Sequence, residues 1–361
     1  MILMEKMSVR KVRVGSVYLG GDLPVLIQSM TNTKTSDVKA TLEQINHLAE
    51  VGCEIIRVAV PQEEDLKGFR EIVKQAPLPV VADIHFNYLL AIKAVEAGAV
   101  KVRINPGNLG GLDKLLEVAK AAKGQAAIRV GVNAGSLPKN YLESINAGHL
   151  NLPEAMAYLA KDYVDFLYDH DFFDVVVSLK ASDVLTTVSA NRKFRTFSEA
   201  PLHLGITEAG TAFSGTVKSA VGMGTLLLEG IGETIRVSLT ADPNNEIKVA
   251  QEILKACGLR RFGPTVISCP TCGRTKIDLY TLAKKVEKMV ESIKEDLVIA
   301  VMGCAVNGPG EAKNADLGIA GGKGEGLIFV GGEVVEKVRE SDLLTRFEFY
   351  LQKVLERRRE N

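Results

Sequence analysis

Short runs of apolar, often β-branched residues recur along the first two thirds of the chain, and longer amphipathic stretches separate them. Eight runs have the length and composition of buried strands; they cover residues 25–30, 54–60, 79–85, 101–107, 127–135, 174–182, 201–210 and 234–243. Apolar residues recur at helical spacing over residues 37–51, 87–97, 114–122, 154–168, 184–197, 216–228 and 247–256. This alternation of strand and helix predicts an α/β fold with a (β/α)8 TIM barrel.

An open, doubly wound sheet is the alternative architecture for the same alternation. Such a sheet more often carries a glycine fingerprint in its first strand-to-helix turn. The residues after Met30 read TNTKTSD and contain no glycine. The barrel is therefore the preferred interpretation.

The last hundred residues follow a different pattern. We expect the barrel to occupy residues 1–258 and a smaller α+β domain to occupy residues 264–361, joined by GLRRFGP. A charged helix is predicted over 280–294, strands over 297–304, 315–322 and 326–332, and a polar helix at the C-terminus. Residues 136–152 are longer than an ordinary loop and predict an extra hairpin or short helix.

Composition and charge restrict the class of protein. Lys plus Arg and Asp plus Glu both number 44, so no global positive field exists to attract nucleic acid or an acidic membrane. No apolar run is long enough to span a membrane, and the N-terminus lacks the apolar centre of a signal peptide. The five cysteines are typical of free thiols or metal ligands in a reducing cytoplasm.

Polar residues recur on one face of the predicted barrel strands. Because side chains alternate along a strand, we predict an inward set made of Arg57, Asp83, His85, Arg103, Asn105, Arg129, Asn133, Ser178, Lys180, His203, Thr207, Arg236 and Ser238. Asp83 is the only acid expected on this face, and Glu208 is expected at the exit of the seventh strand. Five strands contribute an Arg or a Lys.

An anionic ligand would balance these cations. A salt-bridged core layer, or surface charges in a different register, is the alternative, but one acid cannot neutralise five cations. Arginine binds phosphate oxygens through bidentate, charge-assisted hydrogen bonds. Several such contacts at the carboxyl ends of barrel strands favour a diphosphate over a single carboxylate.

Three cysteines in the tail point to a metal centre. Cys269 and Cys272 form a C-x-x-C turn, and Cys304 ends a predicted strand. A C-x-x-C turn alone is shared by zinc sites, redox dithiols and iron–sulfur clusters. Zinc normally takes four Cys or His ligands, and the tail has no histidine. Glu311, beyond a Gly-Pro-Gly turn, is a candidate fourth ligand that would leave one exchangeable iron, although a solvated loop carboxylate is the alternative.

The longer motifs identify a resemblance. IQSMTNT (27–33), ADIHFN (82–87), RINPGN (103–108), VSLKAS (177–182), LGITEAG (204–210), SCPTCGRT (268–275) and GCAVNGPGE (303–311) resemble the hydroxymethylbutenyl diphosphate synthase family of the methylerythritol phosphate route to isoprenoids. The resemblance covers essentially the whole chain and matches the bacterial two-domain form.

The resemblance implies a reaction, a cofactor and partners. The family reductively opens 2-C-methyl-D-erythritol 2,4-cyclodiphosphate, with loss of the C3 hydroxyl, to 4-hydroxy-3-methylbut-2-enyl diphosphate. The resemblance implies a [4Fe–4S] cluster as the cofactor and flavodoxin or ferredoxin as the electron donor. It also implies a homodimer in which the cluster domain of one subunit caps the barrel of the other.

The resemblance also implies roles for residues. The cluster ligands would be Cys269, Cys272, Cys304 and Glu311, and Asn307 would lie close to the cluster. Phosphate contacts would come from Arg57, Arg103, Arg129 and Lys180, with Asn105, Asn133, His203, Thr207 and Ser238 nearby. Glu208 would lie beside the reacting carbons and is our candidate proton donor to the departing hydroxyl.

Three other functions are consistent with parts of the sequence. A phosphate-binding barrel transferase or aldolase with a structural metal in its tail is the main alternative, and metal identity separates the two. An iron–sulfur electron carrier or sensor would need no cationic substrate pocket. Radical chemistry with S-adenosylmethionine is disfavoured because no C-x3-C-x2-C loop occurs.

Overall fold

The computed structural model describes residues 8–304 and 313–360. The chain divides into two compact units, residues 1–260 and 261–361, and each is described by itself. Within the described residues, no helix is long and apolar enough to cross a membrane.

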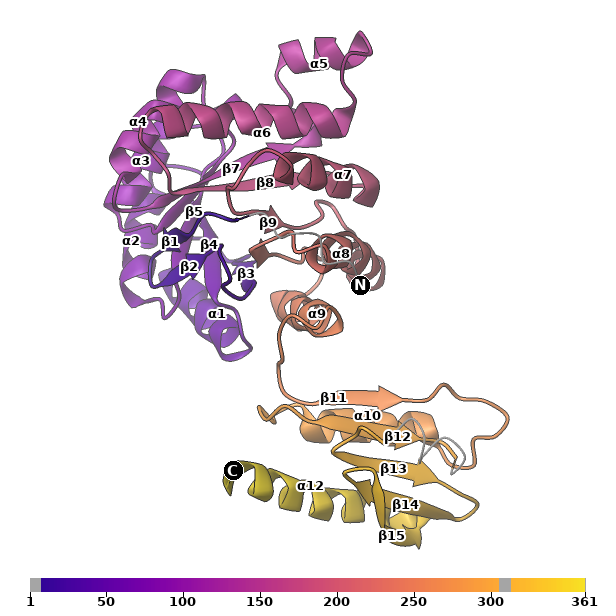
Figure 1. The fold of residues 1–361 in the computed structure, drawn as a ribbon. Coiled ribbons are helices and arrows are strands. Elements are labelled where there is room, and N and C mark those ends of the chain that lie inside the picture. Colours follow the sequence, from indigo (N-terminus) through magenta and orange to yellow (C-terminus); the bar gives the residue numbers. More distant parts are fainter. Residues whose placement is uncertain (1–7, 305–312, 361) are drawn as a thin grey trace. The chain divides into compact units, whose positions relative to one another are not determined.

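The first unit is a (β/α)8 barrel (Figure 1). Its strands are β3 (Leu26–Met30), β4 (Ile55–Ala59), β5 (Val80–Asp83), β6 (Lys101–Ile104), β7 (Ala127–Asn133), β8 (Val175–Lys180), β9 (His203–Leu204) and β10 (Thr234–Ile235). All neighbours are parallel, and β10 pairs with β3. A bridge between Val177 and Leu202 joins β8 to the entry of β9 and closes the ring. The predicted barrel is confirmed.

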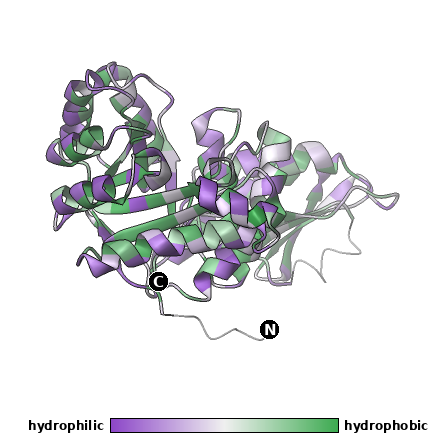
Figure 2. Cartoon of the chain, turned by 90° about the horizontal axis from the view of Figure 1, so that it is seen from above, coloured by the Kyte–Doolittle hydropathy of each residue, from purple (hydrophilic) through white to green (hydrophobic). Residues whose placement is uncertain are grey.

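Helices surround the strands. They are α1 (Val38–Glu50), α2 (Asp65–Gln75), α3 (Tyr88–Glu96), α4 (Leu112–Ala122), α6 (Leu152–Asp169), α7 (Val184–Arg195), α8 (Ala212–Leu228) and α9 (Pro243–Ala256). Figure 2 shows apolar residues concentrated on the strands, while the helices carry both polar and apolar residues. The sequence pattern therefore positions the helices by burying one face of each against the barrel.

Several helices begin at a residue whose side chain caps the helix N-terminus. The Asp37 carboxylate accepts a hydrogen bond from the Ala40 amide at the start of α1. Asn151 and Glu154 form a reciprocal capping box at the start of α6. Such caps satisfy amides that have no partner within the helix.

The structure differs from the sequence prediction in the lengths of two strands and in elements that were not predicted. Strands predicted over 201–210 and 234–243 shrink to β9 and β10, two residues each. Helix α2 and the hairpin of β1 (Val12–Val14) and β2 (Val17–Leu19) were not predicted. The segment after β7, for which an extra hairpin or a short helix was predicted, forms the 3-10 turn η2 (Ala134–Ser136) and the short helix α5 (Lys139–Asn146). Another 3-10 turn, η1 (Pro106–Asn108), follows β6.

The N-terminal hairpin closes the bottom of the barrel. Val12, Val14 and Leu19 form one apolar cluster with the residues at the amino ends of the strands; these are Leu26, Ile55, Val81, Ala127 and Val176. This cluster shows which side chains face inward, and it forms a dry floor beneath the polar residues higher in the barrel.

The second unit is a five-stranded mixed sheet with helices on one face. Its elements are β11 (Thr265–Ser268), α10 (Leu279–Val290), β12 (Val298–Met302), β13 (Leu317–Gly321), β14 (Glu325–Val330), β15 (Glu333–Arg339), the 3-10 turn η3 (Glu340–Asp342) and α12 (Leu343–Glu360). β11, β12 and β13 are parallel, and β14 and β15 are antiparallel. Val286 of α10 and Phe347 of α12 belong to a buried cluster with Ile299 and Ile319 of the sheet.

Candidate functional site

A layer of polar side chains lies above the apolar floor of the barrel. Alternation along each strand places the following residues inward, two positions beyond the floor: Gln28, Arg57, Asp83, Arg129 and Ser178. The inward face predicted from the sequence therefore corresponds to the barrel interior. Because these residues approach the carboxyl ends of the strands, they occupy the end of the barrel where active sites form.

Asp83 is the centre of one ionic cluster. It is 3% exposed, and its carboxylate lies 3.8 Å from Arg57 Nε and 3.3 Å from Arg103 Nη1. His85, which is exposed, places Nε2 3.2 Å from the same carboxylate. Burial raises the pKa of Asp83, but Arg57, the hydrogen bond from His85 and Arg103 outweigh it and hold the pKa below its ordinary value. Asp83 is thus ionised and holds the two arginines in place.

Arg129 has no carboxylate within ion-pair distance among the described residues. It is register partner to Arg103 on the neighbouring strand, is 2% exposed, and its Nε and Nη1 atoms have no hydrogen-bond partner. Burial lowers the pKa of Arg129 well below its ordinary value, and the charges of Arg57 and Arg103 lower it further. A buried, uncompensated cation is costly, so this geometry is one that an anion would stabilise.

Lys180 is a second buried cation without a carboxylate partner in the described chain. Burial lowers its pKa well below the ordinary value, and Arg129 and Arg57 add to the effect. Arg57 itself has a pKa lowered to about 10 by burial, although Asp83 opposes the shift. Lys180, Arg129 and Arg103 lie on the neighbouring paired strands β8, β7 and β6, so their side chains share the barrel interior.

A deeper pair of contacts starts at the level of the floor, because Lys101 is register partner to Val81 and Ala127, and Thr234, the register partner of His203, pairs with Leu26. Lys101, fully buried, donates to Gln28 Oε1 at 3.2 Å. His203, also fully buried, places Nδ1 2.9 Å from Thr234 Oγ1, and its Nε2 has no partner. Burial and then Arg129 lower the pKa of His203 well below its ordinary value, so the ring is neutral and one nitrogen is available to a ligand. Lys101 was not predicted, although it lies two residues before Arg103.

Glu246 corrects the expectation that Asp83 is the only acid on this face. It comes from the first turn of α9 and is 5% exposed. Its carboxylate lies 3.6 Å from Arg236 Nη2 and accepts the Leu239 amide at 2.9 Å. Two carboxylates still do not balance the six inward cations, which are Arg57, Lys101, Arg103, Arg129, Lys180 and Arg236. The excess of positive charge therefore remains.

Two glycines make room for these long side chains. A Cβ at Gly205 would lie 2.5 Å from Lys180 Nζ and 2.7 Å from the Arg236 carbonyl oxygen. A Cβ at Gly131 would lie 3.2 Å from Arg103 Nε. Any larger residue at Gly205 would collide with backbone as well as with the lysine, so the glycine helps define the cationic volume.

The outer predicted residues lie on the loops above the strands. Asn105 Nδ2 donates to Ser136 Oγ at 2.8 Å, and Ser136 Oγ donates to the Asn133 carbonyl at 3.2 Å. These two hydrogen bonds connect the loops that follow β6 and β7. Thr207 and Ser238 are partly exposed and lie beyond the short strands β9 and β10.

Glu208 lies in a turn after β9 with a left-handed backbone. Its φ is 52°, and it is exposed. Non-glycine residues adopt this conformation at a cost, and such positions cluster at functional sites. The turn therefore places Glu208 at the carboxyl end of the barrel in a strained backbone conformation.

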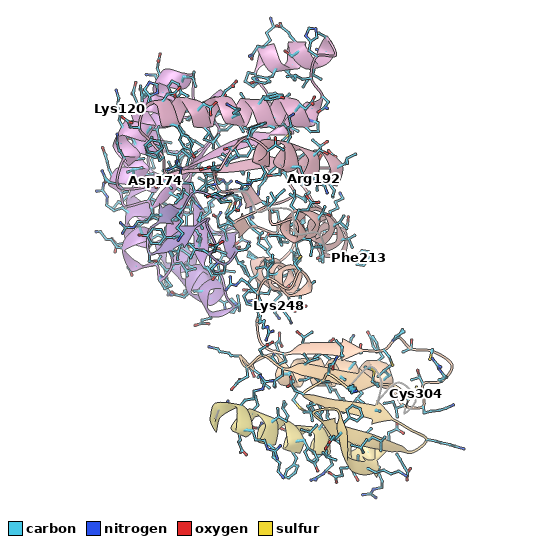
Figure 3. The ribbon with its side chains drawn as sticks, in the orientation of Figure 1. Lys120, Asp174, Arg192, Phe213, Lys248 and Cys304 are labelled. Atoms are coloured by element: carbon cyan, nitrogen blue, oxygen red, sulfur yellow. The ribbon has the colours of Figure 1, made fainter. Side chains whose placement is uncertain are left out.

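The three tail cysteines lie at one edge of the C-terminal sheet. Cys269 directly follows β11, and Cys304 lies two residues beyond the parallel neighbour β12; Figure 3 labels Cys304 at this position. Cys272 is in the loop after β11, and the Lys276 amide of that loop donates to the Gly303 carbonyl at 3.0 Å. Parallel pairing thus brings residues 35 positions apart to the same carboxyl edge.

The surroundings of two of these thiols supply hydrogen bonds to sulfur, and those around Cys272 favour its thiolate. The Gly303 amide donates to Cys269 Sγ at 3.2 Å. Hydrogen bonds from the backbone and side chain of Arg274 lower the pKa of the exposed Cys272 thiol, and Thr275 adds to the effect. Thiolates are the form that binds metals, and hydrogen bonds to sulfur tune iron–sulfur centres.

The three thiols are chemically suited to an iron–sulfur cluster. Within residues 8–304 and 313–360, no three His, Cys, Asp or Glu side chains lie close enough to hold a single metal ion. A cubane cluster bonds each thiolate to a different iron, so its ligands need not converge on one point. Asn307 and Glu311 lie outside the described residues.

The other two cysteines belong to the barrel. All five are free thiols. Cys53 is buried, and burial raises the pKa of its thiol to about 12; Cys257 is half-buried, and burial raises its pKa too. Neither thiol is activated.

Comparison with solved structures agrees with the barrel. The chain is similar to a sialic acid synthetase from Leptospira borgpetersenii, solved with citrate, with a TM-score of 0.50 and 11% sequence identity over 80% of this chain and 100% of that one. At this identity the likeness shows the fold alone.

Comparison with protein families and curated relatives identifies the chain. Residues 9–251 match the GcpE TIM-barrel domain and residues 265–353 the GcpE protein C-terminal domain. It is 52% identical to 4-hydroxy-3-methylbut-2-en-1-yl diphosphate synthase (flavodoxin) of Clostridium perfringens, over 94% of this chain and 97% of that one. It is 53% identical to the protein of the same name from Caldanaerobacter subterraneus, over 95% and 96%. These findings do not favour the transferase or aldolase alternative; the chain belongs to the GcpE family of 4-hydroxy-3-methylbut-2-en-1-yl diphosphate synthases.

Proposed function

We propose that the chain catalyses the reductive ring opening of 2-C-methyl-D-erythritol 2,4-cyclodiphosphate to 4-hydroxy-3-methylbut-2-enyl diphosphate. The reaction breaks the C2–O bond to the ring phosphate and the C3–OH bond, and it forms a C2=C3 double bond. It consumes two electrons and two protons and releases one water. The observation that carries the proposal is the group of buried cations at the barrel mouth, of which Arg129 and Lys180 have no carboxylate among the described residues.

The cations bind the diphosphate. Arg57, Arg103, Arg129, Lys180 and Arg236 approach one volume from five strands and donate charge-assisted hydrogen bonds to phosphate oxygens. Asp83 and Glu246 fix three of these arginines before the substrate arrives. Because the diphosphate oxygen departs from C2 with negative charge, the same contacts stabilise the leaving group.

Neutral side chains around the cations complete the substrate site. His203 presents an unpartnered Nε2, which suits a phosphate or hydroxyl oxygen. The remaining residues that we assign to substrate contact or positioning are His85, Asn105, Asn133, Ser178, Thr207 and Ser238. Their amide, imidazole and hydroxyl groups suit the hydroxyls of the five-carbon skeleton.

Glu208 supplies the proton to the departing C3 hydroxyl. Its turn holds the carboxyl group at the carboxyl end of the barrel. A positioned acid of this kind contributes about 10²–10⁴-fold to rate. Asn307 is assigned beside the cluster from the family resemblance.

The C-terminal domain holds the redox centre. Cys269, Cys272 and Cys304 would bind a [4Fe–4S] cluster, with Glu311 as the fourth ligand. When bound, the cluster supplies one electron at a time and an exchangeable iron that polarises a substrate oxygen. The contacts from Arg274 favour the Cys272 thiolate, and the Gly303 amide donates a hydrogen bond to Cys269 Sγ.

A flavodoxin, or a ferredoxin, would supply the electrons, and the enzyme would act as a homodimer. The relatives carry flavodoxin in their names. The first turns of helices at the barrel mouth expose large apolar side chains, which are Leu89, Leu112, Leu185 and Phe213, and Phe86 precedes α3. Phe213 is 84% exposed, and its place at the start of α8 is labelled in Figure 3. An apolar rim of this kind supports a mouth that is capped by the cluster domain of a second subunit.

The proposal is tested by anaerobic turnover. The reconstituted protein is incubated with the cyclodiphosphate and reduced flavodoxin, and the products are separated by ion-pair chromatography and mass spectrometry. We expect 4-hydroxy-3-methylbut-2-enyl diphosphate with two electrons consumed per product. Unchanged cyclodiphosphate, with the cluster intact and reduced, would overturn the proposal.

A further inference from the structure

Exposed cations lie beside the cysteines in the C-terminal domain. Arg274 and Lys276 belong to the loop that carries Cys272, and both are exposed. β12 and β13 are parallel neighbours, so the turn after β13 lies at the same carboxyl edge as Cys304. Strands β11, β12 and β13 run side by side in Figure 1. That turn carries the exposed Lys323. We call Arg274, Lys276 and Lys323 the cysteine-edge patch.

The loop is fixed against this edge. The Lys276 amide donates to the Gly303 carbonyl at 3.0 Å. A Cβ at Gly321, the last residue of β13, would lie 2.5 Å from the Ile277 side chain. The loop after β11 therefore packs on the ends of both β12 and β13, and this packing keeps the three cations near the thiols.

Lys276 and Lys323 of the cysteine-edge patch lack the ion pairs that are common elsewhere in the domain, whereas the Arg274 side chain hydrogen-bonds to Cys272. Ion pairs join Lys337 to Glu325, Arg339 to Asp342, Arg346 to Glu336, Arg358 to Asp316 and Arg359 to Glu295. No comparable ion pair of the patch residues occurs within residues 261–304 and 313–360. Both lysines are exposed, so their ammonium groups are accessible to an acidic partner.

The geometry points to this patch as the docking surface for an acidic electron-donor protein, an inference that rests on the proposed function. An acidic surface around the donor's redox group would be attracted to the patch and brought beside the exposed Cys272. Opposite charges raise the rate of encounter and fix the orientation of redox partners. Because the proposed reaction takes two electrons, two docking events, each oxidising a one-electron donor, would supply one turnover once the cysteines hold their cluster.

The cyclic diphosphate is the other anion that could meet these cations. The two ligands can be told apart by kinetics. If the patch bound the cyclic diphosphate, a substitution there would alter the KM for that substrate and leave the KM for the donor unchanged. The test therefore measures both constants on the same variants.

The variants are Lys276→Glu and Lys323→Glu in the reconstituted full-length enzyme. Lys288→Glu is the matched control, because Lys288 is an exposed lysine in the last turn of α10, at the opposite end of the helix from the loop that carries Cys272. Iron content and the electron paramagnetic resonance spectrum of the reduced protein check that the cluster is intact. Turnover driven by reduced methyl viologen measures the chemistry without a protein donor.

We expect each reversal at the patch to raise the KM for reduced flavodoxin about five- to tenfold at low salt and to weaken its salt dependence. The control, the KM for cyclodiphosphate and the viologen-driven rate stay unchanged. Calorimetric binding of oxidised flavodoxin measures docking independently of turnover. An unchanged flavodoxin KM and affinity, or a raised KM for cyclodiphosphate alone, overturns the inference. Absence of viologen-driven product in the unmodified enzyme would instead overturn the proposed function.

Discussion

Arg103 and Arg129 are register partners on the parallel strands β6 and β7, and both face the barrel interior. Arg103 has a carboxylate, that of Asp83, 3.3 Å away, whereas Arg129 has no hydrogen-bond partner for Nε or Nη1. Two adjacent buried guanidinium groups with one nearby acid are unfavourable in the free protein. Binding of a diphosphate would reverse that cost, so this pair links stability to substrate recognition.

Substitution of Arg129 by Met should therefore weaken binding and stabilise the protein. Loss of charge-assisted hydrogen bonds worth about 1.5–3 kcal/mol raises the KM for cyclodiphosphate about 10–150-fold. Replacement of an unpaired buried cation by an apolar side chain raises the free energy of unfolding by about 1–4 kcal/mol. Steady-state kinetics and urea unfolding measure the two effects, with exposed Arg70→Met as the control. A normal KM would remove Arg129 from the substrate site.

The neutral, buried His203 predicts a pH dependence of stability. Its folded pKa lies below the unfolded value of about 6.5, so the unfolded state takes up the proton first and stability falls as the pH falls through that value. Between pH 7 and pH 5 the unmodified protein should lose about 2 kcal/mol relative to His203→Gln. Denaturant unfolding across this range provides the measurement, and His149→Gln, at an exposed histidine, is the control. Parallel pH profiles for the unmodified protein and His203→Gln would contradict the neutral ring.

Gly205 tests whether the space around Lys180 matters. In Gly205→Ala the added Cβ would meet Lys180 Nζ at 2.5 Å and the Arg236 carbonyl at 2.7 Å. We expect a loss of about 1–3 kcal/mol in stability and a raised KM for cyclodiphosphate, because the Lys180 ammonium and the Arg236 backbone must both move. Gly135→Ala has no atom within 4 Å of the added carbon and should behave normally. If both variants bind substrate equally well, the steric argument fails.

Glu208→Gln separates proton transfer from binding. The amide keeps the shape of the side chain but cannot donate the proton, so kcat should fall about 10²–10⁴-fold while the KM for substrate and the iron content stay near normal. Asp171→Asn is a matched control, since Asp171 is the other described non-glycine residue with positive φ. Near-normal turnover of Glu208→Gln would remove Glu208 from the chemistry.

The alternation of apolar and polar residues was sufficient to predict the barrel and its cationic interior. Arg57, Arg103 and Arg129 lie on strands in which the alternation of inward and outward side chains is unambiguous. The same pattern could also have identified Lys101, which has the parity of Arg103, and helix α2, whose Phe69 and Ile72 have helical spacing.

Other features depend on tertiary contacts that no local pattern records. Glu246 lies in the first turn of a helix, where an acidic residue is ordinary, and only the packing of α9 on β3 directs it to Arg236. β9 and β10 are short because few of their amides pair across the barrel, and the chain beyond β10 is held by the Leu239 contact to Glu246. The assignment of Glu311 and Asn307 depends on the family resemblance, since both lie outside the described residues.

The most direct test of the account is the iron, zinc and acid-labile sulfide content of protein purified without oxygen. We predict about four irons and four sulfides per chain, as in a [4Fe–4S] centre, with the cluster lost in Cys269→Ser and retained in Cys257→Ser. One zinc without sulfide, persisting after attempted reconstitution, would contradict the reductive mechanism.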